Sequence, residues 1–500
     1  MQGSSLRSID RIRREISQLL DPGRRSRMGQ FMTPSPVADF MASLFTRWPA
    51  SVRLLDPGAG VGSLTEAFAR QFAVHAPAGA SLEVHCFEIE PLLGKHLAAQ
   101  LRELERAAAE NGKSFNGIIH DDDFVSTASF ELGFGKRNFT HAILNPPYRK
   151  INSDSEYRRL LRLAGIETVN LYTAFLGLAV AMVEDGGEIV AVIPRSFCNG
   201  AYFRPFRKFL FERAAVTHIH AFESRIQAFK DDDVLQENII IRLVRAAVPG
   251  QVIVSTSTGV PPGDFRQRTV PFVDIVKPGD AELFIHIPTT EVNGSAGLFE
   301  CSLTDLGLEV STGPVVDFRV RDHWLSAPSA DCVPLLYAHH FKRGTLNWPA
   351  DHRKPNALAL NDETRKWSLP RGCYTLIKRF SSKEERRRLV AYVIEPDDLA
   401  FDLYGFENHL NVIHVRKQGI SPNLAHGLAL FLNSTVVDRH FRNFSGHTQV
   451  NATDLRTMRY PNRMKLEKFG CWARGRKKLT QEAIDRYIER ERGNDKEEAH

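Results

Sequence analysis

Cysteine is scarce in this sequence, and its spacing excludes two kinds of site. Six cysteines lie singly along 500 residues, and no Cys-x-x-Cys pair occurs. This spacing is typical of reduced thiols in a cytosolic protein. It predicts neither a disulfide framework nor a structural zinc site. None of the eighteen histidines lies in an obvious catalytic pattern, so we predict no metal site.

Long apolar runs are also missing. No uncharged apolar run approaches the roughly 20 residues that a membrane helix needs. Residues 1–20 scatter Arg and Glu among apolar residues, whereas a secretion signal carries an uninterrupted apolar core. We therefore expect no membrane segment and a cytoplasmic location. The length and ordinary composition of the chain predict two or three globular domains.

Charge is unevenly distributed along the chain. Residues 301–500 hold 32 Lys and Arg against 25 Asp and Glu, a net charge of +7, and residues 1–300 hold 33 against 34, a net charge of −1. The excess is densest in residues 341–390, with 13 basic and 5 acidic residues, among which aromatic residues are interleaved. This pattern favours a polyanion as partner. The alternative is a solvated charged surface over a small core.

A glycine-rich turn follows the first expected strand. Residues 52–55 form a short apolar run, the motif Asp56-Pro57-Gly58-Ala59-Gly60-Val61-Gly62 follows, and a helix is expected from Ser63. A strand, a glycine turn and a helix bring backbone amides close to a ligand. The motif is not the pyrophosphate fingerprint of dinucleotide folds. Its opening acidic residue better suits the cationic amino-acid end of S-adenosylmethionine.

Two later strand ends carry acidic residues. Glu88 follows the expected strand 82–87, where a carboxylate can accept both ribose hydroxyls of a nucleoside. Asp123 and Phe124 follow residues 117–120, where a carboxylate can accept from an adenine amino group and a ring can pack on the base. For Glu88 the alternative is a helix N-terminal carboxylate, a role that suits Glu90 better. For Asp123 the alternative is a solvated acidic turn.

The motif Asn145-Pro146-Pro147-Tyr148 follows the apolar run 140–144. Two prolines fix φ and lack backbone N–H donors. The carbonyl groups there therefore point outward as acceptors without competition from those donors. Asn145 adds a side-chain oxygen, and Tyr148 adds a flat ring with a polar tip. Acceptors beside a ring suit a planar group that carries NH2, such as a nucleobase or an amide. An ordinary turn is the alternative.

Strands and helices alternate through the first half, which predicts a mostly parallel sheet covered on both faces. Thr33 precedes a helix expected near Ser35, where its hydroxyl can cap the helix or meet a ligand carboxylate.

Pro, Gly, Ser and Thr clusters in residues 245–275 predict a domain boundary at 250–262. We expect a catalytic domain over 1–250, a mixed α+β domain over 262–460 and a charged tail over 461–500.

The order of these motifs resembles the γ-class N6-adenine DNA methyltransferases, and most of all the PstI and Eco57I-type modification enzymes. Phrases in residues 376–384 and 444–451 are similar to the second half of those enzymes. The resemblance implies a Rossmann-like, seven-stranded methyltransferase domain followed by a DNA target-recognition domain. It also implies S-adenosylmethionine as cofactor, double-stranded DNA as substrate and a flipped target adenine.

The resemblance also carries site residues over by position. It implies that Thr33, Asp56, Pro57, Gly58 and Ala59 meet the methionine end of the cofactor, that Glu88 holds the ribose, and that Asp123, Phe124 and Pro147 surround the adenine. Asn145 and the Pro146 carbonyl would accept from the target N6, with Tyr148 and Phe229 stacking on the base.

Other functions stay open at this point. A protein glutamine methyltransferase uses similar acceptors, but those enzymes are short, and the long basic second half favours DNA. A catalytically inactive DNA-binding protein is a further alternative, which the intact motifs disfavour. No Pro-Cys pair supports a cytosine-C5 enzyme. No metal-nuclease cluster is evident, so a fused nuclease is not expected and a separate restriction endonuclease is a compatible partner.

Overall fold

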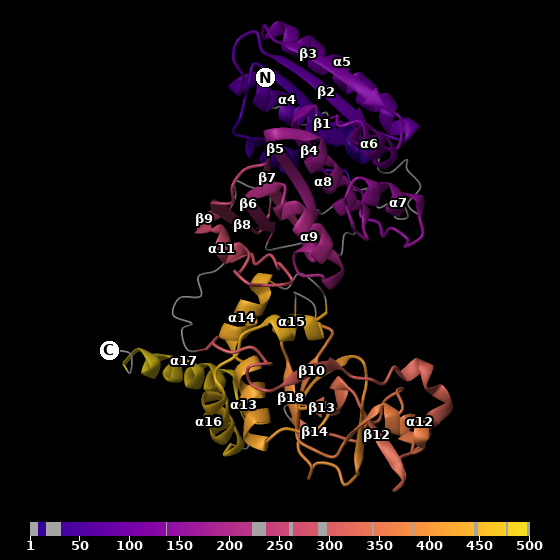
Figure 1. Cartoon of the computed structure of the whole chain (residues 1–500), viewed down its shortest axis with the longest axis vertical. Coiled ribbons are helices and arrows are strands. Elements are labelled where there is room, and N and C mark those ends of the chain that lie inside the picture. Colours follow the sequence, from indigo (N-terminus) through magenta and orange to yellow (C-terminus); the bar gives the residue numbers. More distant parts are fainter. Residues whose placement is uncertain are drawn as a thin grey trace. The chain divides into compact units, whose positions relative to one another are not determined.

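The computed structural model describes residues 9–16, 32–136, 138–222, 237–259, 264–288, 298–342, 345–381, 385–444, 449–476 and 479–497. The chain forms two compact units, Met1–Thr289 and Thr290–His500 (Figure 1). All six cysteines are free thiols. Within the described ranges, no helix has the length and apolar character needed to cross a membrane.

The first unit is built on a nine-stranded sheet with the order β3-β2-β1-β4-β5-β7-β6-β8-β9. Neighbours from β3 to β5 are parallel, β7 is antiparallel to β5 and β6, β8 is parallel to β6, and β9 is antiparallel to β8. The strands are β1 (Ser51–Pro57), β2 (Ser81–Phe87), β3 (Ser114–His120), β4 (Phe139–Leu144), β5 (Val183–Pro194), β6 (Ala214–Phe222), β7 (Asn238–Arg245), β8 (Gln251–Ser257) and β9 (Arg266–Pro271).

Helices cover both faces of this sheet. They are α3 (Ser35–Ser43), α4 (Ser63–His75), α5 (Pro91–Glu110), α6 (Phe124–Gly133), α7 (Glu156–Leu163), α8 (Leu171–Met182), α9 (Arg204–Phe211) and α11 (Phe272–Ile275). Successive strand side chains point to opposite faces. Leu54 and Ile143 therefore enter one core with α3, α4 and α5, and Leu55 and Ala142 enter another with α6, α8 and α9.

The predicted fold class is confirmed, with two corrections to its extent. The sheet has nine strands instead of seven, because β8 pairs with β6 and β9 pairs with β8. For the same reason the first unit runs to Thr289, and the boundary expected at 250–262 was wrong. Residues 250–259 include β8 and lie within one sheet instead of linking two domains.

The second unit holds a four-stranded sheet (β10-β20-β17-β18), a five-stranded sheet (β11-β15-β12-β19-β16) and the pair β13-β14. The strands are β10 (Glu309–Thr312), β11 (Trp324–Leu325), β12 (Cys332–Leu336), β13 (Phe341–Lys342), β14 (Thr345–Leu346), β15 (Ala357–Ala359), β16 (Ser368–Pro370), β17 (Tyr374–Lys378), β18 (Ala391–Ile394), β19 (Leu403–Phe406) and β20 (Leu410–His414). The helices are α12 (Asp362–Lys366), α13 (Pro422–Leu432), α14 (Thr435–Phe444), α15 (Ala452–Thr457), α16 (Arg463–Arg474) and α17 (Gln481–Glu497).

Helices α16 and α17 belong to the core of this unit. Leu466, Phe469 and Ile488 are buried there with residues of α13. The separate charged tail expected over 461–500 was therefore wrong as a domain. Charged residues dominate the composition of this segment, but its apolar residues recur at helical spacing and bury one face of each helix.

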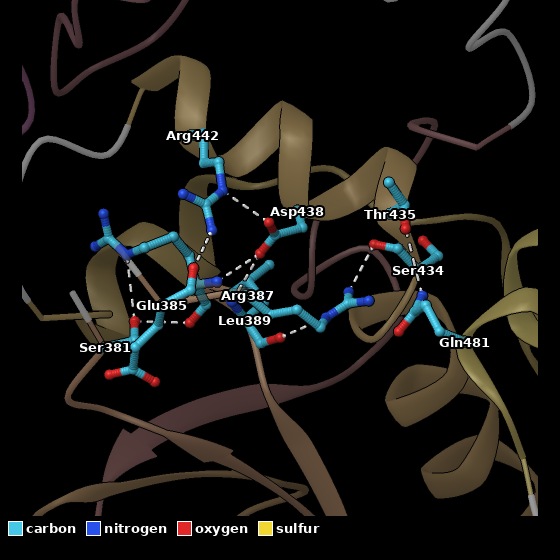
Figure 2. Close-up of polar contacts among 10 residues, drawn as sticks. Ser381, Glu385, Arg387, Leu389, Ser434, Thr435, Asp438, Arg442 and Gln481 are labelled. Atoms are coloured by element: carbon cyan, nitrogen blue, oxygen red, sulfur yellow. Dashed lines mark hydrogen bonds and ion pairs between the residues drawn. The ribbon is translucent and has the colours of Figure 1, made fainter. Parts of the chain in front are cut away.

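A polar network ties α14 to the segment that leads into β18 (Figure 2). Asp438 Oδ1 accepts from the backbone amides of Arg388 and Leu389 at 2.7 and 3.0 Å. Arg442 donates to Asp438 Oδ2 at 2.8 Å, and Arg387 donates to the Ser434 carbonyl at 2.9 Å. Because buried polar groups are costly when unpaired, these contacts hold the segment in one position.

Candidate active site

A cavity of about 220 Å³ opens at the carboxyl ends of the parallel strands in the first unit. Open α/β sheets place ligands at this edge. Eight of the residues predicted from the sequence line it: Thr33, Gly58, Ala59, Glu88, Asp123, Phe124, Asn145 and Pro147. Asp56, Pro57, Pro146 and Tyr148 adjoin these residues in the chain without lining the cavity. Phe229 lies outside the described residues.

The glycine-rich turn needs its glycines for backbone conformation. Gly58, Gly60 and Gly62 have φ values of +79°, +59° and +89°, a region that residues with a Cβ rarely adopt. The amides of Gly58 and Ala59 donate to the Phe87 carbonyl at 2.9 and 3.0 Å. These hydrogen bonds join the turn to the end of β2, and the inner surface of the turn lines the cavity.

Asp56 is a fully buried carboxylate at the end of β1. Its Oδ2 accepts from the Thr65 hydroxyl at 2.7 Å, and its Oδ1 has no partner among the described residues. Burial, with a smaller contribution from the charge of Glu88, raises its pKa from 3.8 to about 7. A positive ligand group placed near Asp56 would favour the ionised form.

The N-terminus of α4 offers the opposite polarity. Ser63 Oγ lines the cavity, is buried, and has no hydrogen-bond partner in the described part of the chain. The N-cap of this helix, Gly62, supplies no side-chain cap. Free amides at a helix N-terminus favour an anion. One turn therefore carries a carboxylate that stabilises a cation and a helix end that stabilises an anion. These two groups fit the ammonium and the carboxylate of an amino-acid moiety.

Glu88 joins the β2 end to the glycine turn. It is buried, and its Oε1 and Oε2 accept from the Glu90 and Gly60 amides at 2.8 and 2.9 Å. Burial raises its pKa, although these hydrogen bonds oppose the shift. A carboxylate has about four acceptor positions, so positions facing the cavity stay available for hydroxyl donors.

Asp123 is held at the start of α6. Its Oδ1 accepts from the amide and hydroxyl of Ser126 at 2.9 and 2.8 Å, and its Oδ2 accepts from the Tyr157 hydroxyl at 2.5 Å. Burial and the hydrogen bond to Asp123 raise the pKa of Tyr157. Asp123 therefore caps α6, a role that was not predicted from the sequence, and it also lines the cavity.

Aromatic side chains from three elements form an apolar wall. The Phe124 ring lies 5.0 Å from both Phe87 and Phe175, measured between centroids. Leu171 and Phe175 of α8 line the cavity but were not predicted as site residues, and the same holds for Tyr157 of α7 and Arg149. The strand-end pattern could not reveal Tyr157, Leu171 and Phe175, because they reach the site through helix packing, whereas Arg149 directly follows the Asn145–Tyr148 turn.

Asn145 is bound from both ends of its carboxamide. Its Nδ2 donates to Thr33 Oγ1 at 3.0 Å, and its Oδ1 accepts from the Tyr148 hydroxyl at 3.1 Å. Tyr148 also approaches the Val192 carbonyl at 3.5 Å. The side-chain oxygen is thus fixed in orientation beside the cavity.

Thr33 does not cap α3, which corrects one of its two predicted roles. The N-cap of that helix is Pro34, without a side-chain cap, and Ser35 donates from its amide and hydroxyl to Asp10 at 3.1 and 3.0 Å. The Thr33 hydroxyl is instead directed to Asn145, 112 residues away in the chain. The segment before α3 therefore reaches the wall of the cavity.

The chain matches known methyltransferases over most of its length. The model of the Eco57I restriction-modification methylase family matches residues 82–229. The type II methyltransferase M.BsuBI of Bacillus subtilis is 47% identical over 93% of this chain and 94% of its own, and M.PstI of Providencia stuartii is 42% identical over 92% of each.

A solved structure supports the fold. The cryoEM structure of a DrdV–DNA complex aligns with 95% of this chain and 60% of that chain, at a TM-score of 0.53 and 13% identity. At this identity the likeness concerns the fold alone. The sequence identities, which extend over more than nine-tenths of both chains, decide the family. The chain belongs to the type II methyltransferases of restriction-modification systems.

Proposed function

We propose that this chain is a site-specific DNA methyltransferase that transfers the methyl group of S-adenosylmethionine to N6 of an adenine in double-stranded DNA. The observation that carries the proposal is the Asn145 carboxamide, oriented by Thr33 and Tyr148 at the wall of the cavity. A fixed oxygen acceptor at that position suits an exocyclic amino group.

The cavity supports S-adenosylmethionine as the cofactor. Asp56 and the α4 N-terminus would take the ammonium and carboxylate of the methionine end, with Pro57, Gly58 and Ala59 shaping the turn. Glu88 would accept from the ribose hydroxyls. Asp123, Phe124 and Pro147 would surround the adenine together with Leu171 and Phe175. When bound, the cofactor supplies a methyl group on a sulfonium, which is a strong electrophile.

Positioning and charge stabilisation would supply most of the catalysis. Adenine N6 is a weak nucleophile because its lone pair is delocalised into the ring. Hydrogen bonds from N6 to Asn145 Oδ1 and the Pro146 carbonyl would favour a pyramidal nitrogen whose lone pair is aimed at the methyl carbon. Asn145 Oδ1 and the Pro146 carbonyl would hold the N6 protons while the sulfonium supplies the methyl group, and the surplus N6 proton would pass to solvent. No strong base is needed before attack.

The target adenine would leave the duplex to reach this site. Base flipping costs a few kcal/mol, and stacking on Tyr148 and Phe229 would offset part of it, at about 1–3 kcal/mol per base. The second unit, which contains the basic excess of residues 301–500, would bind and read the duplex. The relatives support a place in a restriction-modification system. A separate endonuclease as partner and action on DNA in the cytoplasm belong to the proposal.

Isotope transfer tests this function directly. Tritiated S-adenosylmethionine is incubated with plasmid DNA, and methylation-aware sequencing then locates the product. We expect N6-methyladenine within one short recurring sequence. Methyl found on cytosine, or on protein alone, would contradict the proposal.

Substitution of Asn145 tests the site. Asn145→Ala removes the proposed acceptor, so we expect methyl transfer to fall by at least about 100-fold while S-adenosylhomocysteine binding, measured by calorimetry, changes little. Asn116→Ala, an exposed asparagine on β3, is the matched control and should keep wild-type transfer. Loss of cofactor binding together with transfer would show that Asn145 only supports the fold of the turn.

A further inference from the structure

Two phrases of the second unit that lie 70 residues apart in the chain meet at one surface. Phe380 forms an antiparallel bridge with Gln449, and the Val450 amide donates to the Arg379 carbonyl at 2.7 Å. The Arg379 amide in turn donates to the His409 carbonyl at 2.8 Å. Three chain segments therefore meet here, and we call Arg379, Phe380, His409 and Gln449 the Arg379 cluster.

The Arg379 guanidinium orients Gln449. One nitrogen donates to the Asn408 carbonyl at 3.0 Å, and the other donates to Gln449 Oε1 at 3.2 Å. This contact sets which end of the carboxamide faces the guanidinium. In the described part of the chain, Gln449 Nε2 has no hydrogen-bond partner, so it can donate to a ligand.

His409 is oriented in the same way by a buried acid. Glu407 is fully buried, and it accepts from the His409 amide at 2.9 Å and from Nδ1 of its ring. The Nε2 edge of the ring is thereby left for other contacts. The Phe380 ring lies 4.7 Å from the imidazole. Both side chains are substantially exposed, with 46% of the His409 side chain and 40% of Phe380 accessible.

The segment beyond Phe380 is anchored as well. The Ser381 hydroxyl donates to the Arg388 carbonyl at 2.7 Å, and the Arg388 amide donates to Asp438 within the network of Figure 2. Exposed planar groups that are fixed in this way lose little conformational freedom on binding. A purely structural role would explain the buried partners but would not require an exposed ring and imidazole beside a half-buried carboxamide.

Planar donors and acceptors are the groups that read base edges. A glutamine carboxamide makes two hydrogen bonds to adenine, accepting from N6 and donating to N7. Oε1 and Nε2 of Gln449 provide this pair, because an oxygen bound by Arg379 still has a second lone pair. The net charge of +7 in residues 301–500 matches a duplex partner.

We propose that the Arg379 cluster reads the DNA sequence, and that Gln449 contacts the edge of one adenine within the recognition site. The proposal rests on the DNA substrate of the proposed function. Arg379 acts as the positioning residue for Gln449. His409 and Phe380 border the same base pair.

Selection from a random duplex library tests this assignment. Full-length protein saturated with S-adenosylhomocysteine selects its DNA, and the bound pool is sequenced for wild type, Gln449→Ala, Gln449→Glu and the control Gln418→Ala. Gln418 is an exposed glutamine of the same unit. We expect both Gln449 variants to lose at least about 10-fold of the preference for adenine at one position, as a lost bidentate contact predicts. Gln449→Glu should shift that preference toward cytosine.

Other outcomes would overturn the assignment. An unchanged consensus in both Gln449 variants would mean that the residue reads no base. Weaker binding that is equal for all sequences would assign Gln449 to the phosphate backbone. His409→Gln, selected in parallel, should leave the base preferences at the other positions of the recognition site intact. Thermal unfolding confirms that each variant is folded. The readout is independent of the methylated atom, so a wild type that selects a sequence but methylates no adenine would contradict the proposed function alone.

Discussion

Asn145 and Asp56 are both held by hydroxyl groups, with opposite consequences. The carboxamide of Asn145 contacts Thr33 and Tyr148 and keeps its orientation next to the cavity. Among the described residues, the carboxylate of Asp56 has a partner on one oxygen only, Thr65. Under the proposed function, Asn145 would accept from a neutral donor and Asp56 would lie near a positive charge.

The raised pKa of Asp56 predicts opposite pH dependences for stability and for cofactor binding. Because its folded-state pKa of about 7 exceeds the ordinary aspartate value of 3.8, its stabilising contribution is full below pH 4 and is lost as pH rises through 7. Cofactor binding should instead strengthen through the same window, because ionised Asp56 favours the ammonium group.

Asp56→Asn should remove both pH dependences. Calorimetric titration with S-adenosylhomocysteine and thermal unfolding, each from pH 5 to pH 8, measure them. We expect the unfolding temperature of the ligand-free variant to decline less over this range than that of wild type. Equal pH profiles for the two proteins would show that Asp56 does not titrate there.

At the scale of elements, the contact between α13 and α16 depends on two glycines. A Cβ at Gly427 would lie 1.8 Å from the Leu466 carbonyl oxygen, and one at Gly470 would lie 1.7 Å from the Asn423 carbonyl oxygen. The two backbones therefore touch directly. This contact explains why a charged C-terminal segment is part of the core of the second unit.

Gly427→Ala should separate these helices. We expect a loss of about 1–3 kcal/mol or more in unfolding free energy, the usual range for overpacking, measured by denaturant titration. Gly94→Ala is the matched control, because a Cβ there meets no atom within 4 Å. It should be neutral or stabilise α5 by up to about 1 kcal/mol. A Gly427 variant as stable as wild type would mean that the helices can shift apart without cost.

At the scale of the whole molecule, the two units differ in charge and in proposed task. The near-neutral first 300 residues contain the cavity, and the basic last 200 residues contain the Arg379 cluster. Cofactor binding in a buried cavity and DNA binding by a charged surface should therefore respond differently to salt.

DNA affinity should fall steeply with ionic strength. Between 50 and 200 mM salt we expect the dissociation constant, measured by fluorescence anisotropy on a methylatable duplex, to rise by about 1,000-fold if some six phosphates are contacted. S-adenosylhomocysteine affinity over the same range serves as the control and should change little. A DNA affinity insensitive to salt would argue against phosphate contacts.

The local order of residues was enough to predict most of the strand-end site. Glu88 and Asn145 directly follow apolar strands, and Asp123 lies three residues after the end of β3. Parallel strands end at one edge of a sheet, so the neighbourhood of these residues follows from sequence and topology alone. The glycine turn Asp56–Gly62 could also be predicted, because its backbone conformation depends on residues that are adjacent in the chain. The fold class followed from the alternation of strands and helices.

Contacts between distant segments required the tertiary structure. Because β8 pairs with β6, the first unit extends past residue 262 to Thr289. Helix packing places Phe175 at the cavity. A bridge across 69 residues joined Phe380 to Gln449. Chain order alone does not specify such pairings, because they depend on which buried surfaces match in the folded chain. The sequence by itself determined the chemistry at the strand ends, and the tertiary structure decided which other residues share the site and where each unit ends.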